Sequence, residues 1–214
     1  MSLATSYEVN RVRGPFNATF FGLMGPYIEW NVRHHKRRVF AGLPGTVVEI
    51  GSGVGANLRY LRPGSTLVAI EPNTAMHRRL RSAADRCGVR LDLRDSTAEQ
   101  TGLPDHSTDS VISSLVLCTV SDPAAVLTEV RRILRPGGTF RFVEHVAAPA
   151  GTFTRGLQRA LRRPWAWTFE GCSCERDLAT ELRMAGFAHV ELTPYRLHSP
   201  FITFNTQIAG VAHA

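Results

Sequence analysis

The amino-acid sequence predicts a doubly wound α/β fold with a mostly parallel, seven-stranded sheet, and three observations support this fold class. Short apolar segments, such as residues 46–50 and 66–70, alternate with longer segments of helical spacing. A glycine-rich turn follows the first of the short segments. The 214 residues suffice for one domain with a full hydrophobic core. We expect an N-terminal helical lid at residues 1–45 and the sheet domain at residues 46–214.

The elements of the first half follow from residue spacing and turn residues. Residues 1–45 are predicted to be helical, because apolar side chains recur at helical spacing until Pro44-Gly45 ends the segment. The β-branched run at 46–50 predicts a buried parallel strand. After it we expect, in order, a helix at about 54–61, a strand at 66–70, a helix at 74–86, and strands at 89–93 and 110–115.

In the second half, Asp122 can cap a helix that ends at Arg135, because Pro136-Gly137-Gly138 cannot continue it. Residues 149–171 are predicted to be an irregular, aromatic-rich insertion. The remaining expected elements are a strand at 139–143, a helix at 176–185, and strands within 190–192 and 201–211.

The charge of the chain gives little support for a nucleic-acid partner. The formal net charge is +7, yet Lys36 is the only lysine and arginine supplies the other basic side chains, which indicates a bias of composition. The basic cluster at residues 33–38 is interpreted as a solvated helix face, and a weak contact with a membrane surface stays open. Residues 16–30 are too short and too interrupted to span a bilayer, and no secretory signal is present, so we expect a cytoplasmic protein.

The four cysteines show no CxxC spacing, and we expect reduced thiols. The pair Cys172 and Cys174 lacks a second cysteine or histidine cluster to complete a zinc site, so no metal is predicted. Cys118 and Cys172 are assigned packing roles, since cysteine is commonly a small buried side chain.

The turn after the first strand carries the strongest functional signal. It contains Glu49, Gly51, Gly53 and Gly55, and these glycines let a ligand approach the backbone closely. Glu71 ends the next strand, where nucleotide-binding α/β folds hold a ribose diol. A dinucleotide site is the alternative, because the loop also satisfies G-x-G-x-x-G/A. The third glycine at Gly55, the acidic residue before the loop and the lack of a pyrophosphate partner count against it.

The pattern E/D-x-G-x-G-x-G resembles motif I of the class I methyltransferases, whose fold is Rossmann-like. The segments at 69–73, 96–99 with 103–111, and 134–138 resemble that family's ribose-binding, adenine-flanking and fifth-strand turn segments. The resemblance implies S-adenosyl-L-methionine as the cofactor. The implied cofactor-binding residues are Glu49, Gly51, Ser52, Gly53, Gly55, Asn57, Glu71, Pro72, Thr97, Ala98 and Leu115.

A narrower resemblance concerns the methyl acceptor. The strings Leu115-Val116-Leu117-Cys118 and Glu144-His145-Val146-Ala147-Ala148 resemble the mammalian methyltransferase-like thiol S-methyltransferases of the endoplasmic reticulum and lipid droplets. Those relatives begin with a hydrophobic membrane anchor that this sequence lacks, so a small metabolite thiol is the expected acceptor. The fourth strand also lacks the N/D-P-P-Y/F tetrad and the acidic magnesium ligands of other methyltransferases.

A thiol acceptor requires little acid–base help, because an alkyl thiol with a pKa of about 8.5 is partly ionised at neutral pH. His145 is the candidate base if one is used, and a packed histidine is the alternative. The aromatic residues Phe20, Tyr27, Trp165, Trp167 and Phe169 are candidates for an acceptor pocket, with core packing as the rival role. Two other functions stay open: C- or O-methylation of a quinone or polyketide, and a non-catalytic cofactor-binding module.

Overall fold

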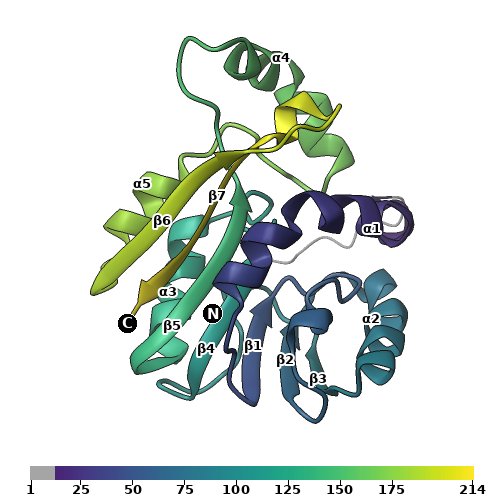
Figure 1. Ribbon diagram of the computed structural model, residues 1–214, viewed down its shortest axis with the longest axis vertical. Helices are drawn as coiled ribbons and strands as arrows, with labels where there is room; N and C mark the ends of the chain where they lie inside the picture. Colours follow the sequence, from purple (N-terminus) through teal and green to yellow (C-terminus); the bar gives the residue numbers. More distant parts are fainter. Residues whose placement is uncertain (1–12) are drawn as a thin grey trace, which may run out of the picture.

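A computed structural model describes residues 13–214 (Figure 1). The part of the predicted lid at residues 1–12 therefore lies outside the described residues. The helices are α1 (Arg13–Val39), α2 (Thr74–Cys87), α3 (Pro123–Ile133), α4 (Phe153–Thr168) and α5 (Leu178–Met184), with short 3-10 turns at η1 (Leu58–Tyr60) and η2 (Ile202–Phe204). The strands are β1 (Thr46–Ile50), β2 (Thr66–Ile70), β3 (Arg90–Arg94), β4 (Thr108–Ser114), β5 (Leu134–His145), β6 (His189–Arg196) and β7 (Thr206–His213).

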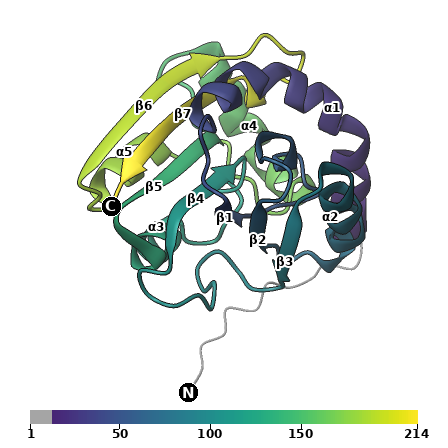
Figure 2. The same ribbon diagram turned by 60° about the horizontal axis from the view of Figure 1, so that its bottom comes forward.

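The seven strands form one sheet in the order β3-β2-β1-β4-β5-β7-β6 (Figures 1 and 2). The first five strands in this order are parallel, whereas β7 runs antiparallel to both β5 and β6. The predicted doubly wound, mostly parallel seven-stranded sheet is therefore confirmed. In such sheets ligands bind at the carboxyl ends of the strands, near the point where the strand order reverses. Here that point lies between β1 and β4.

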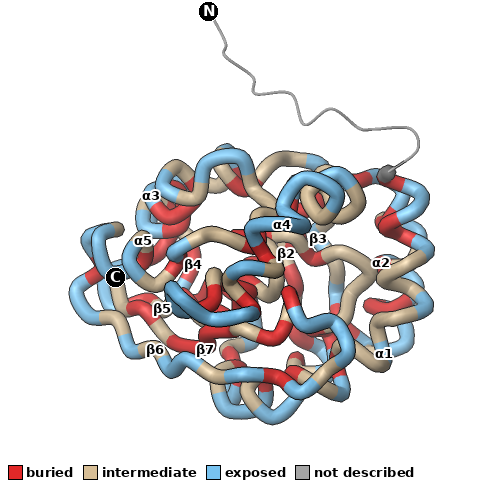
Figure 3. Tube along the Cα trace, turned by 90° about the horizontal axis from the view of Figure 1, so that it is seen from above, coloured by how far each residue is buried: buried red, intermediate tan, exposed pale blue. Residues whose placement is uncertain are grey.

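Helices cover both faces of the sheet, and the side chains of β1 show how. Val48 and Ile50 belong to a buried cluster shared with α3 and α5, whereas Val47 belongs to a cluster shared with α1 and α2. Alternate residues of a strand point to opposite faces, so Glu49 lies on the same side as Val47, beneath α1. Figure 3 shows the resulting pattern of buried strands within a more exposed outer layer.

The predicted helix at 54–61 is wrong. Only the single turn η1 forms there, because Gly51, Gly53 and Gly55 all adopt positive φ values of 63°, 56° and 87°. A right-handed helix needs negative φ, so the loop extends past its third glycine before it can turn. The same conformation keeps the backbone of the loop open to the cavity described below.

The predicted irregular insertion at 149–171 is also wrong, because most of it forms α4. Thr152 caps this helix by accepting a hydrogen bond from the Arg155 N–H at 3.2 Å. Pro164 lies inside the helix, and together with the aromatic run it hid the helical pattern. Trp165 and Trp167 therefore lie on a helix, and Phe169 follows directly after its last residue.

Other boundaries differ by a few residues. The strand expected from Thr139 begins at Leu134, and its pairing with β4 shifts register between Thr108 and Ser110. Asp122 caps α3 as expected, by accepting from the Ala125 N–H at 3.1 Å. Within residues 13–214, no helix combines the length and the apolar character needed to cross a membrane.

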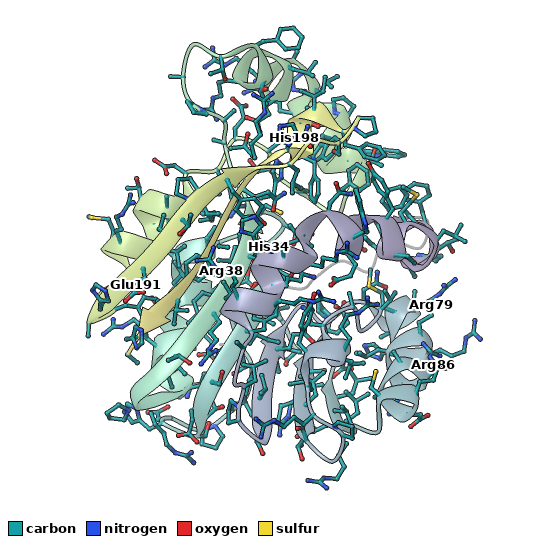
Figure 4. All side chains as sticks on the ribbon, viewed as in Figure 1. His34, Arg38, Arg79, Arg86, Glu191 and His198 are labelled. Carbon is teal, nitrogen blue, oxygen red and sulfur yellow. The ribbon has the colours of Figure 1, made fainter. Side chains whose placement is uncertain are left out.

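The basic cluster at 33–38 is only partly a solvated helix face. His34 and Arg38 are exposed on α1, and Figure 4 labels both. His35 stacks on Tyr195 with ring centroids 3.5 Å apart, and Lys36 is buried. The sole lysine of the chain therefore lies in the interior rather than on the surface.

Candidate functional site

A cavity of about 620 Å³ lies where α1 crosses the carboxyl ends of β1, β2 and β4. One part of its wall comes from the loops after β1, β2 and β3, and we call it the loop half. Its residues are Gly51, Ser52, Gly53, Asn57, Glu71, Pro72, Thr97 and Ala98. The other part, the aromatic half, comes from α1, the loop after β4, the end of α4 and η2. Its residues are Phe20, Cys118, Trp165, Phe169, Cys172 and Phe204.

The loop half begins at Gly51, where the backbone has no room for a side chain. The Gly51 N–H donates to the Ile70 carbonyl at 2.8 Å, which continues the β1–β2 pairing into the turn. A Cβ atom on Gly51 would lie 2.4 Å from a methyl carbon of Val116, and its φ of 63° also disfavours other residues. Glycine is therefore needed here both for conformation and for the approach of the β4 loop.

Glu71 stands at the end of β2, where the sequence predicted it. Its two carboxylate oxygens accept hydrogen bonds from the Gly53 N–H at 2.7 Å and the Asn73 N–H at 2.8 Å. Burial raises its pKa to about 7, although these two bonds oppose the rise. Each carboxylate oxygen can accept a second hydrogen bond, so Glu71 can still receive two hydroxyl donors from the cavity.

A buried network of charged and polar side chains supports the glycine loop after β1. Lys36 donates to Glu29 at 3.1 Å and to Asn57 at 2.8 Å, and Asn57 donates to Glu49 at 2.5 Å. Tyr60 donates a further hydrogen bond to Glu29. Burial lowers the pKa of Lys36, partly offset by Glu29, and burial raises the pKa of Glu49 to about 7. The network ties α1, β1 and η1 together at the wall of the cavity.

The loop after β4 joins the two halves. Leu115 adopts a positive φ of 62°, an uncommon conformation for a non-glycine residue. The buried Glu144 carboxylate holds the loop by accepting from Ser113 Oγ at 2.6 Å and from the Val116 and Leu117 N–H groups at 3.0 and 3.1 Å. Burial raises the pKa of Glu144 to about 7. These bonds fix the backbone that carries Cys118.

The aromatic half is formed by rings from separate segments. Phe169 packs between Phe20 and Trp165, with ring centroids 5.3 and 4.6 Å away. Trp165 also donates from Nε1 to the Cys172 sulfur at 3.3 Å. This wall offers apolar surface and sulfur atoms, which suits a soft, weakly polar ligand.

Two cysteines and a histidine meet behind these rings. The Cys118 and Cys172 sulfurs lie 3.3 Å apart, and His145 Nδ1 lies 3.7 Å from the Cys172 sulfur. The hydrogen bond between the thiols lowers the pKa of Cys172 and raises that of Cys118. His145 itself is fully buried and reaches the cavity only past Cys172, so its predicted role as a base stays a prediction.

The structure brings most of the predicted cofactor residues to one wall. Gly51, Ser52, Gly53, Asn57, Glu71, Pro72, Thr97, Ala98 and Leu115 all line the cavity. Glu49 and Gly55 lie just outside that wall: Glu49 contacts it through Asn57, and Gly55 packs closely on Leu58. Their assignment as cofactor-binding residues remains a prediction.

The predicted acceptor residues divide into two groups. Phe20, Trp165 and Phe169 line the cavity, whereas Tyr27 and Trp167 do not. Trp167 is 66% exposed on the outer side of α4, and Tyr27 faces the Phe201 ring at 6.3 Å. Sequence reasoning missed Glu29, Lys36 and Arg176, which also line the cavity. One feature of the sequence could have pointed to Lys36: it is the single lysine of a chain rich in arginine.

Comparison with known proteins identifies relatives of this arrangement. Residues 48–142 match the family described as methyltransferase domain. The chain is similar to human thiol S-methyltransferase TMT1A, with 35% identity over 72% of this chain and 65% of the relative. Human thiol S-methyltransferase TMT1B is 32% identical over 73% of this chain and 69% of the relative. The match thus spans about two thirds of the length of these relatives.

Solved structures share the fold at low sequence identity. A putative methyltransferase from Haloferax volcanii, solved in complex with its Trm112 activator, superposes with a TM-score of 0.68. It is 21% identical, and the match covers 93% of this chain and 97% of that one. At this identity the similarity concerns the fold alone.

Proposed function

Because the chain belongs to the S-adenosylmethionine-dependent methyltransferases, we propose that it methylates the sulfur of a small thiol. The observation that carries the proposal is the 35% identity to a thiol S-methyltransferase over most of this chain. The apolar, sulfur-lined aromatic half of the cavity is compatible with such an acceptor. When bound, S-adenosylmethionine supplies a methyl group on a positively charged sulfur.

The loop half fits this cofactor. Glu71 has free lone pairs for the two ribose hydroxyls, and the backbone of Gly51 and Gly53 leaves room for the ligand. Among the described residues one oxygen of the buried Glu49 lacks a hydrogen-bond partner, as expected of a site built around a polar ligand. Lys36 uses two of its three N–H donors within the described network, and the third would suit a carboxylate.

The residues of the aromatic half would act by orientation and by exclusion of water. A thiolate needs alignment with the methyl group and the leaving sulfur more than it needs a strong base. Phe20, Trp165 and Phe169 would keep water from the reacting sulfur, which strengthens its attraction to the positive charge of the cofactor.

The test is a comparison of acceptors with the purified protein and labelled cofactor. Small thiols of graded acidity, matched phenols and amines are assayed across pH 6 to 9. We expect thiols to react fastest, with rates that rise with pH as the thiolate fraction grows. Faster methylation of the matched phenols, or rates independent of thiol acidity, would contradict the proposal and favour O-methylation. Cofactor binding without turnover of any acceptor would favour a non-catalytic module.

A further inference from the structure

Three potential metal-binding side chains from distant parts of the sequence meet behind the aromatic half of the cavity. They are Cys118 after β4, His145 at the end of β5, and Cys172 after α4. All three are buried, and their sulfur and nitrogen atoms lie within 4.8 Å of one another. Both cysteines also line the cavity. We call these residues the Cys–His–Cys cluster.

The histidine ring is oriented as a metal-ligating histidine usually is. His145 Nε2 lies 2.7 Å from the Thr203 carbonyl oxygen, so this nitrogen carries the proton and donates it. The lone pair of Nδ1 therefore points toward Cys172. Histidines that bind metals commonly donate their other ring N–H to a backbone carbonyl in this way. Trp165 adds a second outer contact through its N–H bond to the Cys172 sulfur.

The spacing of the cluster is close to that of a tetrahedral zinc site. Zinc bonds of about 2.3 Å to sulfur and about 2.0–2.1 Å to nitrogen place neighbouring ligand atoms roughly 3.5–3.8 Å apart. The observed separations are 3.3 Å between the sulfurs and 3.7 Å between Cys172 and His145. Adjustments of the side chains would bring all three atoms around one ion.

We propose that Cys118, His145 and Cys172 bind one Zn²⁺ ion and leave its fourth position open to the cavity. The acceptor thiol occupies this position as a thiolate, a step that rests on the proposed function. Three protein ligands with one open position are the pattern of catalytic rather than structural zinc sites. The sequence predicted no metal, because the pair Cys172 and Cys174 lacks a second cysteine or histidine cluster nearby in the chain. In the structure Cys174 instead contacts the Gln158 carbonyl at 3.3 Å.

The chemistry of this arrangement balances. On coordination the acceptor thiol loses its proton to solvent, and its sulfur becomes a zinc-bound thiolate. A sulfur lone pair then forms the bond to the methyl carbon, while the bond from that carbon to the cofactor sulfur breaks. Its electron pair stays on the cofactor, whose sulfur becomes neutral. The neutral thioether product is a weaker ligand than the thiolate, and it leaves the ion.

The charges support the same assignment. Two cysteine thiolates neutralise Zn²⁺, and the acceptor thiolate adds one negative charge. That charge is opposite to the positive sulfur of the cofactor. The cluster thus holds an anionic acceptor in a buried site without leaving an unpaired charge there.

The experiment measures metal binding apart from turnover. The reduced protein is freed of metal and titrated with Zn²⁺ against a chromophoric chelator, and separately with Co²⁺ as a spectroscopic probe. Wild type is compared with Cys118→Ser, Cys172→Ser and His145→Gln. Cys87→Ser serves as the matched control, because Cys87 lies on α2 away from the cluster. Circular dichroism and thermal unfolding check that each variant is folded.

We expect wild type and Cys87→Ser to bind one ion per chain with equal affinity, and each cluster variant to bind at least about tenfold more weakly. Co²⁺ should show thiolate-to-metal charge-transfer absorption that grows when 2-mercaptoethanol is added. Equal affinity for wild type and folded Cys118→Ser would overturn the proposal. So would a disulfide between Cys118 and Cys172 under the reducing conditions of the titration.

Failure of the proposed function gives a different result. Zinc binding at the cluster without methylation of any thiol would refute the thiol acceptor and leave the metal site standing. Full thiol methylation by the metal-free protein would refute the role of the metal and leave the thiol acceptor standing.

Discussion

The two halves of the cavity are built in different ways. The loop half depends on backbone geometry and buried charge: positive φ values at its glycines, the carboxylate of Glu71, and the network around Lys36. The aromatic half depends on side chains from α1, α4 and η2 that meet by packing. Changes in the loop half should therefore cost stability or cofactor affinity, whereas changes in the aromatic half should alter the use of acceptors. Five predictions test this difference, from the largest effect to the smallest.

The largest effect is expected from Lys36→Met. The substitution leaves Glu29 buried without its cation, and breaking a buried ion pair costs about 3–5 kcal/mol. The free energy of unfolding, measured in urea, should fall by this amount. Adding Glu29→Gln should restore part of it, because the unpaired charge is removed. Arg37→Met, at an exposed position of the same helix, should change it by less than about 0.5 kcal/mol. Equal losses for Lys36→Met and Arg37→Met would contradict a supporting role for the network.

Gly51→Ala should be the next most damaging change. The added methyl group meets Val116 at 2.4 Å, and the left-handed conformation adds about 1–2 kcal/mol of strain. With overpacking, we expect a loss of about 2–4 kcal/mol in the free energy of unfolding. Gly45→Ala is the control, since no atom lies within 4 Å of the added carbon and its φ is not positive. A Gly51→Ala protein as stable as Gly45→Ala would show that the loop can rearrange.

Glu71→Gln should weaken S-adenosylmethionine binding by at least tenfold. Charge-assisted hydrogen bonds of the carboxylate are worth about 1.5–3 kcal/mol. Isothermal titration calorimetry gives the affinity, and Asp92→Asn at an exposed position of β3 is the control. An unchanged affinity in Glu71→Gln would remove this residue from the cofactor site.

Cofactor affinity should also depend on pH through Glu71. Because burial raises the pKa of Glu71 to about 7, the carboxylate is increasingly protonated as pH falls from 8 to 6. The neutral form accepts hydroxyl hydrogen bonds less strongly, so cofactor affinity should fall over this range. Glu71→Gln should abolish the dependence. Asp92→Asn should keep it, since Asp92 lies at an exposed position of β3 and pairs with Arg94. Persistence of the full dependence in Glu71→Gln would assign it to another group.

The smallest effect is expected in the aromatic half. Phe169→Leu removes a ring that lines the cavity and contacts Phe20 and Trp165. The KM for the acceptor should rise by about tenfold, as for the loss of a few apolar contacts, with cofactor affinity unchanged. Trp167→Leu, on the exposed side of α4, should leave KM within about twofold. Similar KM changes for the two variants would mean that the rings act on stability rather than on the acceptor.

The sequence by itself determined the elements whose signals are local. The strands β1 and β2 have the bounds that their β-branched runs predicted, and Asp122 caps α3 as expected. The position of Glu71 directly after β2 also follows from local order, because a strand end and the following turn are fixed by neighbouring residues. The predictions from sequence were wrong where two local signals pointed to different structures. The positive φ values of three glycines prevent the helix that the apolar spacing predicted at 54–61. Pro164 lies inside α4, so its presence did not mark a break in the helix.

The tertiary structure alone decided which distant side chains meet. Lys36 stands in a run of basic residues, and only the packing of α1 over β1 shows that it is buried against Glu29 and Asn57. Trp165 and Trp167 are two positions apart, and the rotation of α4 turns one into the cavity and the other into solvent. Cys118 and His145 come together because the parallel strands β4 and β5 place their carboxyl ends at one edge of the sheet. The segment after α4 brings Cys172 to them, and the Ser173 N–H of that segment donates to the Cys118 carbonyl at 2.7 Å. Sequence spacing carries no record of such contacts, since the chain between them can fold back in many ways.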